Sequence, residues 1–108
     1  MNKIAIASIG NEYVDQHFGN AKYWQIYEKI GEEYIFLEQR LTSSYCKGSC
    51  EGGFEHIISK LNDCDGIFVA KIGEQAAAVM LEKGKRVFTC NMAAVEDLIE
   101  ELRENDDY

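Results

Sequence analysis

The chain has 108 residues, 46% of them hydrophobic, and its 11 Lys and Arg residues against 19 Asp and Glu residues give a formal net charge of −8. This length predicts a single domain, 1–108, and so much negative charge disfavours nucleic acid or an anionic membrane as a partner, because both bind through basic patches. No apolar run approaches the roughly 20 residues that span a bilayer, and the N-terminus reads as neither a secretory signal nor a transit peptide, so we expect a cytoplasmic protein with no membrane attachment.

The first predicted element is a strand over residues 3–8, K-I-A-I-A-S. Such a short, nearly continuous apolar run is typical of a strand covered on both faces. Turn residues then break every periodicity from Ile9 to Lys22. Asp15 is expected to cap this loop. His17, in the same loop, is a candidate ligand, although it could equally hydrogen-bond within the loop.

A hairpin is predicted next. Residues 23–30 and 34–41 are rich in aromatic and β-branched side chains and are joined by Gly31-Glu32-Glu33. Two such strands with so short a connection must be antiparallel. Tyr23 and Trp24 are expected to pack in the strand, with the lining of a ligand crevice as the alternative. A loop over residues 42–53 follows.

That loop contains Y-C-K-G-S-C-E-G-G, residues 45–53, with Cys46 and Cys50 among three glycines. Thiolates are soft ligands for zinc, copper(I) and iron–sulfur clusters, and glycines let the backbone approach a bulky ligand closely. A zinc site usually has a second ligand pair at regular spacing. This single C-x₃-C pair therefore leaves three interpretations open: metal ligands, a thiol redox pair and two ordinary free thiols.

After the loop the hydrophobic period changes to that of helices alternating with short strands. Phe54, Ile57, Ile58 and Leu61 form one helical stripe, and His56 lies off it, where a solvated residue is expected. Gly73 begins a second helix and Gly84 is its predicted C-terminal cap. The predicted elements are a helix over 54–61, a strand over 66–70, a helix over 73–83, a strand over 86–89, a helix over 92–103 and an acidic tail at 104–108.

The order β-β-β-α-β-α-β-α predicts an α/β fold with three layers, α/β/α, around a mixed five-stranded sheet. Right-handed crossovers place the fourth strand beside the first. The expected strand order is 3-2-1-4-5, with the second strand antiparallel to the others.

This topology brings several loops to one edge. Ligands of open α/β sheets bind outside the carboxyl ends of the strands, so His17, Cys46, Cys50 and Cys90 are candidates for one site. Gly73 begins a helix at that edge, and its free N–H groups would favour an anionic ligand. Cys90 is equally explained as a small packed side chain. Cys64 falls at the opposite edge and is predicted to be a buried structural thiol.

Three stretches carry a family resemblance: residues 4–8, I-A-I-A-S; residues 14–21, V-D-Q-H-F-G-N-A; and residues 23–28, Y-W-Q-I-Y-E. Together they resemble the dinitrogenase iron–molybdenum cofactor biosynthesis family, which includes small NifX-type proteins and the C-terminal domain of NifB. The pieces C-D-G at 64–66, I-G at 72–73 and Gly84 are also similar. The resemblance covers about residues 2 to 102.

The resemblance implies a ribonuclease-H-like fold that binds or carries an iron–sulfur or iron–molybdenum cluster, or its precursor, transiently and without catalysis. His17 matches the family's loop histidine, and Cys46 and Cys50 are added as ligands by inference. The implied partner is a protein that donates or accepts the cluster, and two copies could share ligands in a homodimer. The alternatives are a protein-interaction or regulatory module and a thiol redox protein. An enzyme is not expected, because no nucleophile–base–orienter set or phosphate loop appears.

Overall fold

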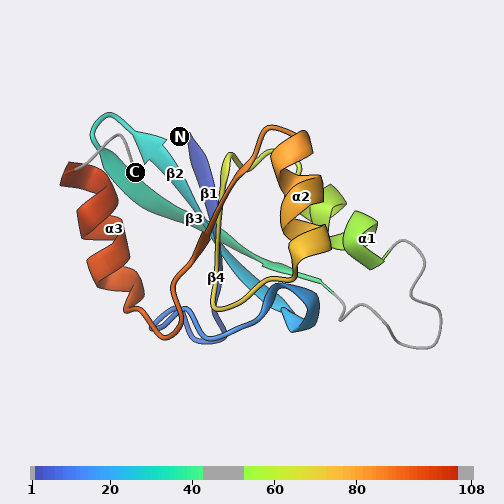
Figure 1. Ribbon diagram of the computed structural model, residues 1–108. Coiled ribbons are helices and arrows are strands. Elements are labelled where there is room, and N and C mark those ends of the chain that lie inside the picture. Colours follow the sequence, from blue (N-terminus) through green and yellow to red (C-terminus); the bar gives the residue numbers. More distant parts are fainter. Residues whose placement is uncertain (1, 43–52, 105–108) are drawn as a thin grey trace.

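The computed structural model describes residues 2–42 and 53–104, without the side chains of residues 20 and 53–56. Figure 1 shows the elements in chain order. They are β1 (Lys3–Ala7), the 3₁₀ turn η1 (Phe18–Asn20), β2 (Tyr23–Ile30), β3 (Glu33–Leu41), α1 (Gly53–Lys60), β4 (Gly66–Val69), α2 (Glu74–Glu82), β5 (Arg86–Thr89) and α3 (Val95–Glu104).

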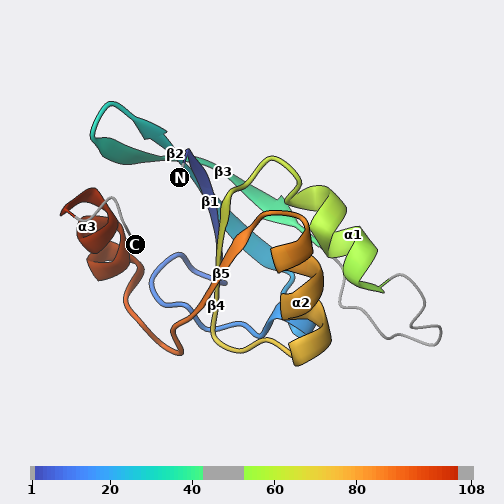
Figure 2. The same cartoon turned by 45° about the horizontal axis from the view of Figure 1, so that its top comes forward.

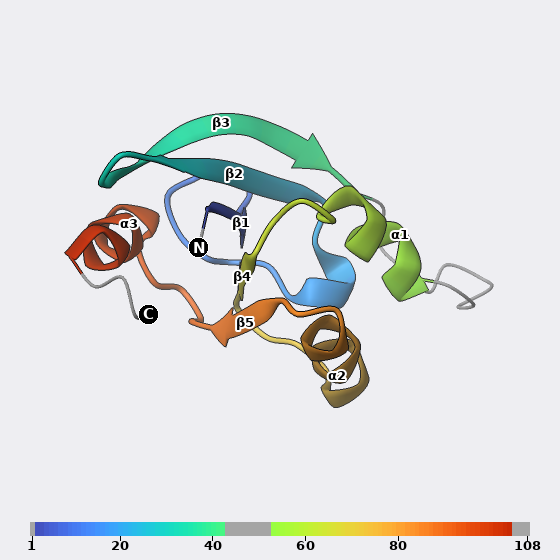
Figure 3. The same ribbon diagram turned by 90° about the horizontal axis from the view of Figure 1, so that it is seen from above.

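The strands form one five-stranded sheet of order β3-β2-β1-β4-β5. β2 runs antiparallel to both β1 and β3, whereas β1, β4 and β5 are parallel to one another. This confirms the predicted order and the single antiparallel strand. In Figure 3, α1 and α2 cover one face of the sheet and α3 covers the other, as the predicted three layers require. The likeness to ribonuclease H stays a prediction.

The two faces of the sheet contact separate hydrophobic clusters, and β1 contributes to both. Ala5 and Ala7 face the cluster under α1 and α2, and Ile4 and Ile6 face the cluster under α3. All four are fully buried. Because both faces of β1 are covered, its sequence is a continuous apolar run. The small alanines lie on the side that also receives Trp24 and Phe18.

An ion-pair network ties β3 to the corner between α1 and β4. Arg40 donates to both carboxylate oxygens of Asp63, at 2.6 and 2.9 Å, and to the carbonyl of Lys60 at 2.8 Å. Lys3 donates to the same carboxylate at 3.0 Å. The Arg40 hydrogen bond, with a further contribution from Lys3, holds the pKa of Asp63 well below its usual range.

Cys64 follows this corner and is fully buried, as predicted. Burial raises the pKa of its thiol to about 12. Lys85, itself 8% exposed, donates from Nζ to the carbonyls of Asn62 and Cys64, both at 2.8 Å. The buried ammonium therefore satisfies carbonyl groups that follow the end of α1, where main-chain acceptors lack helical partners.

The helix boundaries agree with the sequence at α2 and differ at α3. Gly84 follows α2 with φ +79°, the left-handed conformation expected of a glycine cap. The prediction that the last helix begins at Met92 was wrong, because α3 begins at Val95. Met92 has φ 61°, and its N–H donates to the carbonyl of Val14. No helix in the described part of the chain is long and apolar enough to cross a membrane.

We expect Asp63→Asn to lower the free energy of unfolding at pH 7, and the difference from wild type to shrink as the pH falls below about 4. The unfolded carboxyl, with an ordinary pKa of about 3.9, takes up a proton before the folded one, so the contribution of Asp63 is lost on acidification. Urea unfolding at pH 7 and pH 3 measures both values. Glu82→Gln, at the exposed end of α2, is the control. A difference for Asp63→Asn that is unchanged at pH 3 would contradict the role of the ion pair.

Candidate functional site

The loop between β1 and β2 runs across the carboxyl ends of β4 and β5 and bonds to both following connections. Phe18 N–H donates to the carbonyl of Lys71 at 2.8 Å, and Ala70 N–H donates to that of Gln16 at 2.9 Å. Further along the loop, Val14 exchanges hydrogen bonds with Met92 and Ala93 at 2.8 and 2.9 Å. In Figures 1 and 2 the loop lies at the same end of the sheet as the β4–α2 connection. The predicted meeting of these loops is therefore present.

Within the loop, residues 14–18 alternate strictly between buried and exposed. Val14, Gln16 and Phe18 are buried, and Asp15 and His17 are exposed. This is the pattern of an extended segment lying on a core, where successive side chains point to opposite sides. His17 has extended dihedrals, φ −79° and ψ 147°, and pairs in a short parallel bridge with Lys71. The imidazole is thus held on the outer side of a docked backbone.

Two polar side chains stabilise this path. Gln16, which is 8% exposed, donates from Nε2 to the carbonyl of Tyr23 at 2.8 Å and accepts from the N–H of Lys22 at 3.1 Å. Asp15 accepts from the N–H of Ile9 at 3.1 Å, so its predicted role as the loop cap is confirmed. These side-chain hydrogen bonds within the loop add to the main-chain bonds that attach it to Ala70 and Lys71.

The end of β3 is attached to the same loop by a short chain of hydrogen bonds. Trp24 Nε1 donates to Thr42 Oγ1 at 3.0 Å, and Thr42 Oγ1 donates to the carbonyl of Ala21 at 2.7 Å. Thr42 N–H donates to the carbonyl of Lys22 at 2.9 Å. Cys46 and Cys50 lie outside the described residues, but the described chain leaves β3 at Thr42, next to the loop that presents His17.

Gly73 is the N-cap residue of α2, and no side chain caps this helix end. An added Cβ at Gly73 would meet no atom within 4 Å. Lys22 and Lys71 are exposed near this end of the sheet, as are Asp15 and Glu74. Glu12 of the same loop is a third exposed carboxylate, so two cations offset two of three carboxylates and this edge is only slightly negative in a chain of net charge −8.

Cys90 follows β5 and is half-buried against the cluster under α3. Burial, with a smaller contribution from the carboxylate of Glu101, raises the pKa of its thiol. This environment favours the protonated thiol over the thiolate that binds metals. Among the described residues, no group of three or more His, Cys, Asp or Glu side chains is arranged to hold a metal ion. His17, Gly73 and Cys90 stay predictions as ligand contacts, as do Cys46 and Cys50.

Sequence reasoning missed the contribution of Thr42, and Trp24 was expected to pack in its strand or, as the alternative, to line a ligand crevice. Trp24 does pack, because it is fully buried edge-on to Phe18 with ring centroids 6.0 Å apart. Its indole N–H also bonds Thr42, the residue that follows β3. No local pattern indicates a bond between side chains 18 residues apart.

Comparisons with known proteins are consistent with this fold. The sequence profile of the family described as dinitrogenase iron-molybdenum cofactor matches residues 1–105. The chain is similar to the FeMo cofactor biosynthesis protein NifB of Herbaspirillum seropedicae, with 38% identity over 72 residues that cover 65% of this chain and 14% of that protein. For NifB of Bradyrhizobium diazoefficiens, the identity is 31% over 83 residues, covering 75% and 17%. The chain thus spans about one sixth of the length of these curated relatives.

Two solved structures share the fold. The crystal structure of PH0822 superimposes with a TM-score of 0.72 at 20% identity, covering 94% of this chain and 88% of the other. The structure of mj0327 from Methanocaldococcus jannaschii gives a TM-score of 0.66 at 17% identity, covering 96% and 90%.

We expect Gln16→Leu to lower the free energy of unfolding by about 1–3 kcal/mol, because it leaves the N–H of Lys22 without its acceptor and removes a donor from the carbonyl of Tyr23. Gln75→Leu, an exposed position on α2, is the matched control and should change stability little. Urea unfolding monitored by circular dichroism measures both variants. Equal stability of Gln16→Leu and wild type would mean that the Gln16 hydrogen bonds to Tyr23 and Lys22 do not stabilise the loop.

Proposed function

The chain belongs to the dinitrogenase iron–molybdenum cofactor family, and we propose that it binds or carries an iron–sulfur or iron–molybdenum type cluster, or a precursor of one, at the carboxyl edge of its sheet. The observation that supports this most is the exposed imidazole of His17 on a loop that is bonded to the connections after β4 and β5. In this proposal the protein takes part in cofactor biosynthesis in the cytoplasm. It acts by binding and transfer rather than by catalysis.

The loop geometry suits an inorganic ligand. An imidazole nitrogen is a good ligand for iron, and it binds best when the protein fixes its position in advance. The backbone on either side of His17 is anchored, through Gln16 to Ala70 and through Phe18 to Lys71. Because the side chain itself is exposed, a bulky cluster could reach it without displacing the core.

The charge distribution also favours this edge. Thiolate-ligated clusters are usually anionic, so an acidic protein repels them unless the site is locally less negative. Lys22 and Lys71 offset two of the three exposed carboxylates here, and the N-terminus of α2 adds partial positive charge. By contrast, α3 carries five carboxylates and one guanidinium. Of these two regions, the carboxyl edge is the one at which an anion meets less repulsion.

Cys46 and Cys50 join His17 in the proposed ligand set, on the basis of the sequence. An iron–sulfur cluster is generally held by four protein ligands, and His17 with two thiolates supplies three. The remaining ligand would come from the donor or acceptor protein, or from a second copy of the chain. Shared ligation of this kind suits a carrier that must release its cluster.

The test is anaerobic loading of the protein with iron and sulfide, followed by its absorption spectrum and metal content. We expect wild type to become coloured, and His17→Ala, Cys46→Ser and Cys50→Ser each to retain much less iron. Cys64→Ala, which removes a buried thiol at the opposite edge, is the control and should load like wild type. If all three edge variants load as well as wild type, the proposal fails. A Cys46–Cys50 disulfide that cycles in a protein that never retains iron would favour the redox alternative.

Gly73→Ser tests the contribution of the N-terminus of α2 to ligand binding separately from that of His17. A serine hydroxyl at the N-cap accepts from the free N–H groups of α2, so we expect stability to rise by a few tenths of a kcal/mol. Because the hydroxyl competes with an anionic ligand for those groups, loaded clusters should also be lost faster to a chelator. Gly10→Ser, where an added Cβ likewise meets nothing within 4 Å, is the control. If Gly73→Ser loses its cluster no faster than wild type, the N-terminus of α2 is not part of the site, and His17 stays the candidate ligand.

A further inference from the structure

A recess lies between β3 and α3. Its volume is about 390 Å³, and it is lined by Glu33, Tyr34, Ile35, Glu96, Ile99, Glu100 and Arg103. β3 starts at Glu33, near the turn of the hairpin, and β2 runs antiparallel to β1. The end of the cleft formed by Glu33 and Arg103 is therefore at the opposite end of the sheet from His17, and a role for the cleft does not depend on cluster binding.

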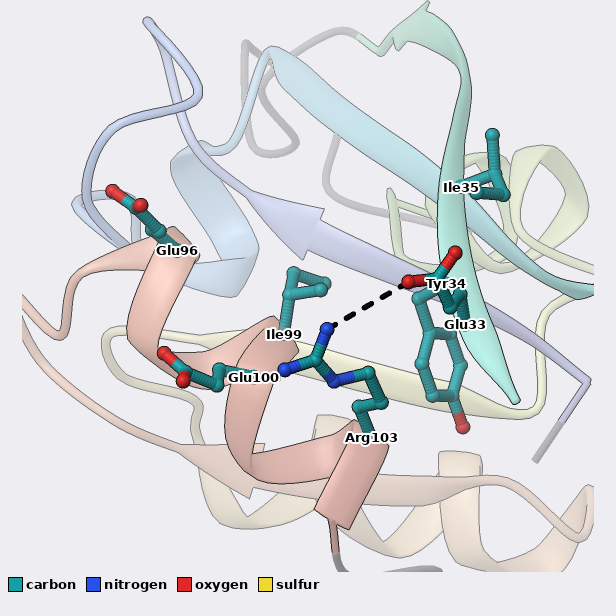
Figure 4. Close-up of a pocket in the computed structure, with 7 residues that line it drawn as sticks. All are labelled: Glu33, Tyr34, Ile35, Glu96, Ile99, Glu100 and Arg103. Carbon is teal, nitrogen blue, oxygen red and sulfur yellow. Dashed lines mark ion pairs between the residues drawn. The ribbon is translucent and has the colours of Figure 1, made fainter.

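The lining of the cleft combines an apolar floor with an acidic rim. Ile99 packs against the cluster under α3, and Tyr34 is only 7% exposed. In Figure 4, Ile99 and Arg103 extend from α3 toward β3. Arg103 Nη1 is 3.7 Å from a carboxylate oxygen of Glu33. The lining thus has one cation, Arg103, and three carboxylates, those of Glu33, Glu96 and Glu100, so its net charge is negative.

The hairpin beside the cleft exposes several large apolar side chains. Nine large hydrophobic residues are more than about two-fifths exposed among the described residues, and five of them lie on the β2–β3 hairpin: Ile30, Ile35, Phe36, Leu37 and Leu41. β3 is the outermost strand of the sheet on that side. Phe36 lies on the α3 face, where its ring contacts that of Tyr27, whereas Ile35 points to the opposite face of the strand.

We propose that this cleft docks a basic, amphipathic segment of a partner protein, in which Lys or Arg side chains accompany apolar ones. The apolar side chains would cover Ile99, and the cations would pair with Glu96 and Glu100. Charge complementarity selects this occupant. A second copy of the chain would bring its own net charge of −8 to an already acidic surface, whereas a basic segment gains from the same field.

The probe is a short synthetic peptide in which lysine and leucine alternate, titrated into ¹⁵N-labelled protein at low salt. We expect the largest amide shifts at residues 33–36 and 96–103, with little change at residues 16–18. Glu96→Gln with Glu100→Gln should weaken binding about 2- to 20-fold, because each removes one exposed ion pair. Added salt should weaken wild-type binding as well.

The matched control is Asp97→Asn with Glu101→Gln, which removes the same charge from the same helix at exposed positions outside the cleft. It should bind the peptide nearly as well as wild type. Ile99→Ser tests the apolar floor, with circular dichroism to check that the variant is folded, and should also weaken binding.

Three results would overturn the proposal. The control pair could weaken binding as much as the cleft pair, which would mean general attraction to an acidic protein. A peptide of alternating glutamate and leucine could shift the same amides equally. Finally, the same amides could shift with protein concentration alone, alongside a dimer in sedimentation, which would assign the cleft to a second copy of the chain.

Discussion

The structure depends on the docking of one extended segment, residues 14–18, across the ends of β4 and β5. Val14 and Phe18 are buried in different hydrophobic clusters, one on each face of the sheet. Between them the buried Gln16 satisfies main-chain groups that would otherwise be costly to remove from water. The segment therefore fastens the two faces together at one end. The residue that it leaves on the outside, His17, is the one with ligand chemistry.

Most of the fold could be predicted because its signals are periodic. The change from two-residue to 3.6-residue periodicity after Gly53 separates the hairpin from the alternating helices and strands, and the handedness of crossovers then fixes the strand order. The start of α3 could not be predicted in this way. Met92 adopts a left-handed conformation that is rare for its residue type. It does so where its N–H bonds Val14, a contact between distant parts of the chain.

The meeting of the loops at one edge could be predicted, but many of the contacts that hold them together could not. The alternation V-D-Q-H-F is visible in the sequence and is sufficient to place His17 outward once residues 14–18 are known to be extended. The bond from Trp24 to Thr42 depends on the relative placement of two strands and has no local signature. The same holds for the cleft between β3 and α3, because Glu33 and Arg103 meet only in the folded chain. Cys90 shows the limit of arguing from residue type, since its surroundings favour the thiol.

The pairing of β1 with β4 has a consequence for how the chain reaches this state. Ile4 of β1 lies beside Gly66 of β4, and β4 in turn pairs with β5. The parallel partner of the central strand β1 is therefore synthesised much later than β1 itself. The hairpin of β2 and β3 joins neighbours in sequence and can form early, but its apolar side chains then lack their cover. A nascent chain on the ribosome thus leaves Tyr27 and Tyr34 of the hairpin uncovered until α3 emerges. Chaperone binding in that interval would protect the surface that the finished protein keeps partly open.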